Sequence, residues 1–204
     1  MGTKLPKNEN WNTGTLTGAP QVAGMLGELG AAWAFMEHML VGVLAHVLKI
    51  RRSAAEAVLF ALNNSAAKLD IIESVADRNA KEPTRKLLMT AVQTAKSLAK
   101  RRNVFVHHLI GYDDRGRLCR WDFREAEDVQ ARRIIFRIED IDDLIMEIRE
   151  LSNALQYAVH PEMGPPPPLP RTPRKPLNAP KRAKDSGGQS SATAPPRLRR
   201  PYPE

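Results

Sequence analysis

The chain has 204 residues, of which 42% are hydrophobic and 26% are charged, and its formal net charge is +8. This length suits one domain of ordinary size with an appendage. The single cysteine, Cys119, excludes an internal disulfide and a cysteine-based metal cluster, and the polar first fifteen residues do not resemble a secretion signal. We therefore expect a protein of a reducing compartment, with the cytoplasm as the default location.

Composition divides the chain into a flexible lead (residues 1–18), a helical domain (19–160) and a tail (161–204). The tail holds thirteen of the 16 prolines and nine basic against three acidic residues, which gives it +6 of the total charge of +8. A segment so poor in large apolar residues cannot bury enough surface to fold, so we expect a disordered, basic, proline-rich tail. It is either an electrostatic arm for nucleic acid or an acidic partner, or a solubilising tail without a fixed role.

The first helix is predicted over residues 21–52, where apolar side chains recur at steps of three and four. It contains the most hydrophobic window of the chain, Ala31 to Leu48. Glu37 and two histidines lie inside this window, and the window is short for a membrane span. We therefore expect a buried helix and no membrane association.

A second stripe on the same helix gives it two faces to cover. The stripe consists of Ala34, Glu37, Val41, Leu44 and Leu48. Either a second chain covers one of the two faces, which predicts a homodimer, or the helix lies at the centre of its own bundle.

A second helix is predicted from Ser53, which forms a capping-box pattern with Glu56, to about Asn79. Pro83 suits the first turn of a third helix.

Beyond Gly111 a turn signal precedes two β-like runs, Leu118–Phe123 and Arg133–Ile138, and Glu139–Val159 has the pattern of a last helix. The expected fold class is mainly α: an up-and-down bundle of four or more helices, with a small β-hairpin before the last helix.

The most informative stretch lies at the end of the third helix. The apolar stripe of this helix is formed by Leu88, Val92, Ala95 and Ala99. Arg102 takes the next position on the stripe, although a guanidinium cannot lose its charge and is costly to bury unless a carboxylate, a phosphate or a partner surface meets it. Asn103 and His107 lie four residues apart on the neighbouring face.

The order of these elements, with an Arg-Asn-x-x-x-His signature ending the third helix, resembles the HEPN superfamily over roughly residues 20–160. In that superfamily a polar residue follows the arginine, and a histidine comes after four to six intervening positions. Arg102, Asn103 and His107 fill the signature with four intervening residues. The resemblance implies a metal-independent endoribonuclease without a cofactor, whose active site is completed when two protomers pair their motifs in a dimer. A candidate role is a toxin or defence effector, restrained by an antitoxin or another regulatory protein.

The chemistry of metal-free RNA cleavage suits these residue types. The reaction needs a proton acceptor for the 2′-hydroxyl, a proton donor for the leaving 5′-oxygen, and a cation for the charge that develops on the phosphate. His107 can transfer protons near neutral pH, Arg102 can clamp phosphate oxygens, and Asn103 can orient the histidine or the phosphate. One motif supplies one histidine, so a dimer would supply both an acid and a base.

Two other registers of the motif exist, namely Arg101 with His107 and Arg102 with His108. We prefer Arg102 with His107 because Asn103 then follows the arginine, which leaves His108 as an auxiliary or a surface residue. The structural alternative is a buried Arg-Asn-His network that only holds helices together.

Two charged residues are candidate supports for this site. Glu37 lies on an apolar stripe and needs a cationic partner, for which Arg102 and Lys68 are the candidates. It either positions Arg102 for phosphate or forms a plain salt bridge between helices. Lys68 either faces the same cleft or is solvated. We assign no metal ligand, because His38 and His46 lack the carboxylates or cysteines of a metal site.

The predicted hairpin carries a second candidate RNA-binding surface, formed by Arg115, Arg117, Arg120 and Trp121. Interleaved arginines and aromatic residues can follow a phosphate backbone and stack on bases. Equally, Trp121 can anchor the hairpin while the arginines face water. The competing functions are a non-catalytic helical dimer that binds nucleic acid or a partner protein, and a scaffold that docks partners through its proline-rich tail.

Overall fold

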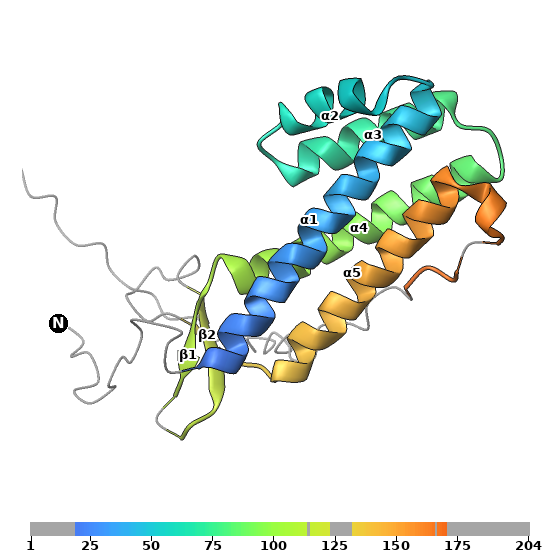
Figure 1. The fold of residues 1–204 in the computed structure, drawn as a ribbon. Coiled ribbons are helices and arrows are strands. Elements are labelled where there is room, and N and C mark those ends of the chain that lie inside the picture. Colours follow the sequence, from blue (N-terminus) through green and yellow to red (C-terminus); the bar gives the residue numbers. More distant parts are fainter. Residues whose placement is uncertain (1–18, 114, 123–131, 166, 171–204) are drawn as a thin grey trace, which may run out of the picture. The chain divides into compact units, whose positions relative to one another are not determined.

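A computed structural model describes residues 19–113, 115–122, 132–165 and 167–170. The expected lead, and residues 166 and 171–204 of the expected tail, lie outside these residues. The elements in chain order are α1 (Pro20–Leu48), α2 (Arg52–Phe60), α3 (Ser65–Asn79), α4 (Thr84–Val106), β1 (Leu109–Tyr112), β2 (Leu118–Asp122), β3 (Arg132–Ile135), α5 (Ile138–Val159) and the short 3-10 helix η2 (Pro161–Met163) (Figure 1). The predicted class, a mainly α bundle, is confirmed, and a small antiparallel sheet precedes the last helix where a β-hairpin was predicted.

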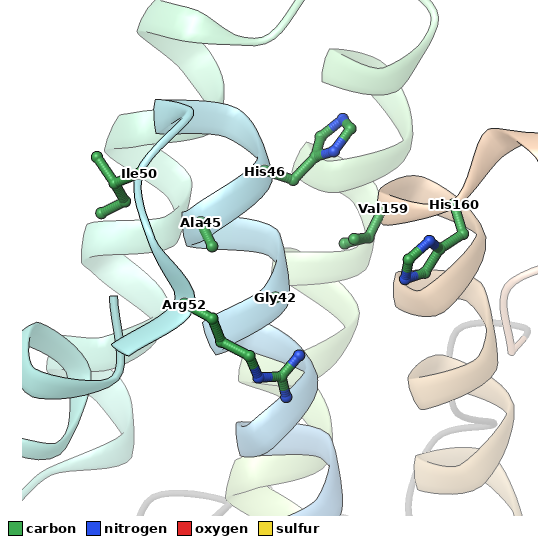
Figure 2. Close-up of a pocket in the computed structure, with 7 residues that line it drawn as sticks. All are labelled: Gly42, Ala45, His46, Ile50, Arg52, Val159 and His160. Carbon is green, nitrogen blue, oxygen red and sulfur yellow. The ribbon is translucent and has the colours of Figure 1, made fainter. Parts of the chain in front are cut away.

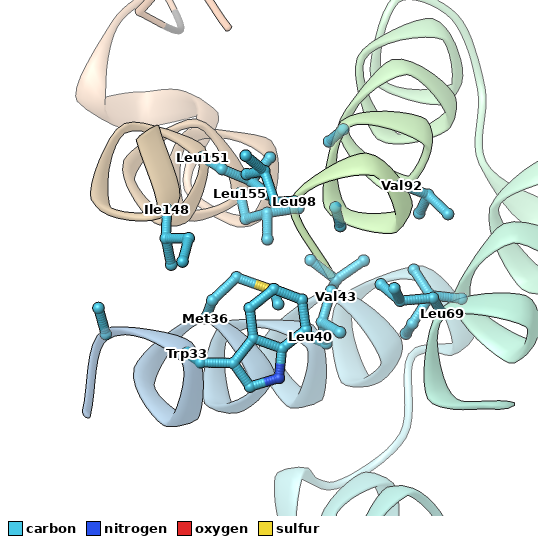
Figure 3. Close-up of a cluster of buried hydrophobic side chains, with 14 of the residues drawn as sticks. Trp33, Met36, Leu40, Val43, Leu69, Val92, Leu98, Ile148, Leu151 and Leu155 are labelled. Atoms are coloured by element: carbon cyan, nitrogen blue, oxygen red, sulfur yellow. The ribbon is translucent and has the colours of Figure 1, made fainter. Parts of the chain in front are cut away.

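α1 is the core helix of the bundle. It begins with Pro20 in its first turn and ends where Lys49 adopts a left-handed conformation with φ of 55°. It packs along α5 and also contacts α2, α3 and α4. Figure 3 shows one face of α1 meeting the facing sides of α4 and α5. The labelled core side chains there are Trp33, Met36, Leu40, Val43, Leu69, Val92, Leu98, Ile148, Leu151 and Leu155.

The second stripe of α1 is covered largely by the same chain. Val41 and Leu44 are 0% and 1% exposed, whereas Ala34 and Leu48 are exposed. Helices of the same chain therefore cover the middle of this stripe, so the stripe does not indicate contact with a second chain.

α1 is, among the described residues, one helix long and apolar enough to cross a membrane by length and composition, with a mean hydropathy of 1.5 over its best window. Length therefore does not exclude a span, contrary to our expectation. The core helix of a soluble protein passes the same test, and α1 buries nine residues against the bundle. The described part of the chain thus fits a compact soluble helical protein, and its cellular location stays a prediction.

The expected single helix from Ser53 to Asn79 is wrong, because the structure divides it into α2 and α3. The side chain of Asn64 accepts hydrogen bonds from the backbone N–H groups of Ala66 at 2.7 Å and Ala67 at 3.2 Å, and so caps α3. α2 instead begins at Arg52 without a side-chain cap, so the capping box predicted at Ser53 does not form. An asparagine side chain competes with the helix backbone for hydrogen bonds, which is why the chain breaks here.

The sheet has three antiparallel strands in the order β1-β2-β3, one more than the predicted hairpin. Leu109 of β1 lies opposite Trp121 of β2, and Cys119 of β2 lies opposite Ile135 of β3. β1 begins two residues after the end of α4, so the sequence pattern of the helix did not let us predict this strand. The rings of Phe105 and Phe136 meet edge to face with centroids 5.3 Å apart, which joins α4 to the segment between β3 and α5.

Candidate active site

The Arg-Asn-x-x-x-His signature lies where α4 ends and the sheet begins. α4 buries its earlier apolar residues and ends at Val106, with His107 at the C-cap. Asn103 and His107 are exposed, and Arg102 is partly buried. The structure therefore brings the three residues to the end of one helix, next to β1.

Arg102 is held by an aromatic ring rather than by an acid. Its guanidinium carbon lies 5.7 Å from the centroid of the Trp33 ring on α1, which is the range of a cation–π contact. Its Nη1 donates to the side-chain oxygen of Asn103 at 3.2 Å. Its Nε is buried, and no residue that the structure describes accepts a hydrogen bond from it. Among those residues no carboxylate pairs with Arg102, so a cationic group with unused donors is left at this end of the helix.

Glu37 binds Lys68 and not Arg102, which decides between the two predicted partners. The Lys68 ammonium lies 2.6 Å from the carboxylate, and the two side chains are only 11% and 13% exposed. Trp33 Nε1 donates to the carboxylate at 2.9 Å, and the Ser65 hydroxyl donates to the same oxygen. Burial alone would raise the pKa of Glu37, but the hydrogen bonds from Lys68, Ser65 and Trp33 outweigh it and lower the pKa below the usual 4.5.

Lys68 is a buried residue rather than a solvated one. Its ammonium also lies 5.2 Å from the centroid of the Phe60 ring. The plain inter-helix salt bridge is therefore the role that the structure shows for Glu37 and Lys68. Their connection to Arg102 is indirect, because Glu37 and Arg102 contact different parts of Trp33.

Trp33 and Ser65 are two contributors that our sequence analysis missed. Trp33 precedes Glu37 by four residues on a helix, so the spacing alone already placed the indole beside the carboxylate. Ser65 belongs to a different helix, and no pattern in the sequence connects it with Glu37.

Neighbouring side chains are already paired, which distinguishes the three registers of the motif. Arg101 forms a salt bridge with Glu147 of α5. His108 Nδ1 accepts a hydrogen bond from Arg120 Nη1 at 2.7 Å, since a guanidinium can only donate. His107 makes no side-chain hydrogen bond to any residue in the described part of the chain. Within the described residues, Arg102 with His107 is thus the register in which neither side chain takes part in a salt bridge or an arginine–histidine contact.

Two of the candidate RNA-binding arginines of the hairpin are engaged within the protein. Arg117 donates to Asp113 from Nε at 2.8 Å, and Arg120 binds His108. Arg115 is exposed. Trp121 lies in β2, but its side chain is outside the described parts, so its contact with RNA stays a prediction.

Asp113 organises the turn between β1 and β2. Its carboxylate accepts hydrogen bonds from the backbone N–H groups of Arg115 at 3.0 Å and Arg117 at 2.8 Å, and Gly116 supplies the positive φ of 70° that the turn needs. Burial alone would raise the pKa of Asp113, but the backbone and guanidinium hydrogen bonds from Arg117 and the backbone N–H of Arg115 lower it to about 2.

Among the described residues, no group of three or more histidine, cysteine, aspartate or glutamate side chains could hold a metal ion. No family model, no curated protein and no solved structure matches the chain. The structure by itself defines the class: a mainly α bundle with a three-stranded sheet, in which a partly buried arginine and an exposed histidine share the end of α4.

Proposed function

We propose that this protein is a metal-independent endoribonuclease of the HEPN type that acts as a dimer. The observation that carries the proposal is Arg102, a partly buried guanidinium with a buried, unsatisfied Nε and no carboxylate partner among the described residues. Such a group is costly unless an anion meets it, and phosphate oxygens match its fork of donors. Exposed His107, five residues further on, supplies a group for proton transfer.

The proposed reaction has two proton transfers. His107 of one protomer takes the proton of the 2′-hydroxyl, and the 2′-oxygen attacks phosphorus. The bond from phosphorus to the 5′-oxygen breaks as the partner's His107 gives a proton to that oxygen. The products are a 2′,3′-cyclic phosphate and a 5′-hydroxyl. Arg102 stabilises the charge on the phosphate, and Asn103, already bonded to Arg102, orients it.

A nuclease with this activity would damage the RNA of the cell that makes it. The proposal therefore includes a role as a toxin or defence effector in the cytoplasm, with an antitoxin or regulatory protein as its partner. The candidate for that contact is the same end of α4, because a protein that covers Arg102 and His107 would block RNA.

The test is cleavage of mixed RNA in excess EDTA by the parent, Arg102→Ala and His107→Ala. Loss of the acid–base group in His107→Ala costs about 100-fold or more, and loss of the cation that stabilises the phosphate charge in Arg102→Ala costs a similar factor, so both variants should lose most of the activity. Arg101→Ala and His108→Ala are matched controls because they replace the neighbouring residue of the same type, and we expect them to stay within a few-fold of the parent. Circular dichroism verifies that each variant is folded.

RNA that is bound but not cleaved by the parent would favour the alternative, a non-catalytic helical dimer that binds nucleic acid. Loss of cleavage in Arg101→Ala or His108→Ala, with retention in the other two variants, would assign the chemistry to another register. Cleavage that only a divalent ion supports would overturn the metal-independent mechanism.

A further inference from the structure

A shallow cavity of about 330 Å³ shares no residue with the candidate active site and has one arginine and two histidines in its lining (Figure 2). The cavity is formed by the end of α1, the connection to α2 and the end of α5. Its lining residues are Gly42, Ala45, His46, Ile50, Arg52, Val159 and His160.

Arg52 provides the fixed positive charge of this cavity. Its side chain crosses α1 at Gly42, where Nη1 lies 3.7 Å from the position that a Cβ would occupy (Figure 2). Its Nη2 donates to His38 Nε2 at 2.5 Å, since a guanidinium can only donate. No carboxylate pairs with Arg52 within the part of the chain that the structure describes. The guanidinium therefore keeps donors for an external anion.

The surroundings of Arg52 consist of histidine, basic and apolar side chains and one carboxylate. His46 lies in the last turn of α1, and His160 caps the end of α5. Lys49 and Arg51 are exposed on the connection between α1 and α2. The acid bonded to a lining residue is Glu162, whose carboxylate is 3.0 Å from His160 Nδ1.

We propose that this cavity binds a small phosphate monoester. Arg52 would clamp the phosphate oxygens with two donors, and the imidazole of His46 would donate a further hydrogen bond, while His160 stays bonded to Glu162 through Nδ1. The organic part of the ester would rest on the apolar lining from Ala45, Ile50 and Val159. This inference does not depend on the proposed nuclease activity, because the two sites have no residue in common.

The test uses phenyl phosphate and inorganic phosphate, each titrated into the full chain and followed by NMR. Both should shift amide signals of the cavity, and phenyl phosphate should bind more tightly because its ring covers apolar surface. Arg52→Gln should weaken phenyl phosphate binding about tenfold or more, which is the value of a charge-assisted hydrogen bond. Arg51→Gln is the matched control: Arg51 is adjacent, exposed and outside the cavity lining, and its replacement should change the affinity by less than about twofold.

An equal loss in Arg51→Gln would overturn the proposal, because it would mean that a diffuse basic surface attracts the anion. The absence of saturable binding, or phenyl phosphate binding no tighter than inorganic phosphate, would also overturn it. RNA binding that depends on Arg52, without binding of phenyl phosphate, would assign this surface to a nucleic acid instead. In Arg102→Ala and His107→Ala the amide signals of the cavity should respond to phenyl phosphate as in the parent, whatever the effect of these substitutions on RNA cleavage.

Discussion

At the scale of single residues, the Trp33 indole contacts two charged residues that take part in different interactions, Glu37 and Arg102. The Trp33 Nε1 donates to Glu37 at 2.9 Å and to the Ser65 hydroxyl at 3.3 Å, which fixes the orientation of the ring. The face of the same ring lies under Arg102. The ion pair of Glu37 and Lys68 therefore stabilises the bundle and at the same time orients the surface on which Arg102 rests.

Removing one partner of this ion pair should destabilise the protein strongly. In Lys68→Met the Glu37 carboxylate stays buried with only Ser65 and Trp33 as donors, so we expect a loss of about 2–3 kcal/mol in the free energy of unfolding. Urea unfolding followed by circular dichroism measures it. Arg149→Met is the control: Arg149 pairs with Glu28 at 3.4 Å where both side chains are more than half exposed, and its loss should cost less than about 1 kcal/mol. Equal losses would mean that the Glu37 pair gains nothing from burial.

The same pair sets a pH dependence whose sign follows from the lowered pKa of Glu37. A carboxyl group whose pKa is lower in the folded than in the unfolded state stabilises the fold above the unfolded pKa. This contribution is lost as the pH falls below about 4.5 and through the folded pKa.

The candidate site was predictable in its residues but not in its contacts. An arginine on an apolar stripe and the spacing from Arg102 to His107 are visible in the sequence. The partner of Arg102 is not visible in the sequence, because it is an aromatic ring. Trp33 donates to Glu37 through Nε1, and the face of its ring contacts Arg102. A buried arginine usually pairs with a carboxylate, but here the carboxylate of Glu37 already pairs with Lys68.

At the scale of elements, a short polar connection decides where α3 begins. Asn64 caps α3 through two backbone N–H groups. Asn64→Ala should lower the free energy of unfolding by about 1 kcal/mol, since the capped N–H groups lose their acceptor. Asn63→Ala changes the preceding exposed asparagine and should have an effect within about 0.5 kcal/mol. Similar effects of the two substitutions in thermal or urea unfolding would exclude Asn64 as the cap.

The turn between β1 and β2 leads to a second prediction, which concerns how its stability depends on pH. Because the pKa of Asp113 is lowered to about 2 from 3.8, its carboxylate stabilises the turn above about pH 4, and this contribution is lost between about pH 4 and 2. An NMR titration of the Arg115 and Arg117 amide signals should have a midpoint near pH 2. In Arg117→Met the guanidinium is gone and the midpoint should rise toward 3.8. A midpoint that is already ordinary in the parent would contradict the hydrogen bonds of this turn.

Helices with a strong hydrophobic periodicity could be predicted from the sequence, whereas short elements could not. The sequence pattern places the last helix at Glu139–Val159, and the structure has α5 at Ile138–Val159. The break between α2 and α3 contains no proline or glycine, so only the two asparagines marked it. β1 begins two residues after a helix and has only four residues, which are too few for an alternation to be recognised.

At the scale of the whole molecule, the proposed reaction requires two catalytic histidines, whereas a single chain offers one. Cleavage needs a base and an acid, but within the described residues His107 is the histidine of the motif that no other side chain engages, since His108 binds Arg120. The burial of Val41 and Leu44 within the bundle removes the apolar argument for a dimer. What supports a dimer is therefore the chemistry of the proposed site, and the dimer must be tested through that chemistry.

A mixing experiment tests it directly. Parent and His107→Ala chains are co-expressed or refolded together in equal amounts, so that protomers assort at random at constant total protein. If every site needs both histidines, only parent dimers cleave, and activity should fall to about one quarter; independent chains would give about one half. Mixing the parent with Arg101→Ala, an active control, should cause no such loss. Sedimentation of each mixture verifies that dimers form, and co-purification of parent and variant chains that carry different affinity tags verifies that they mix. An activity of one half in such mixed dimers would show that each chain carries a complete site.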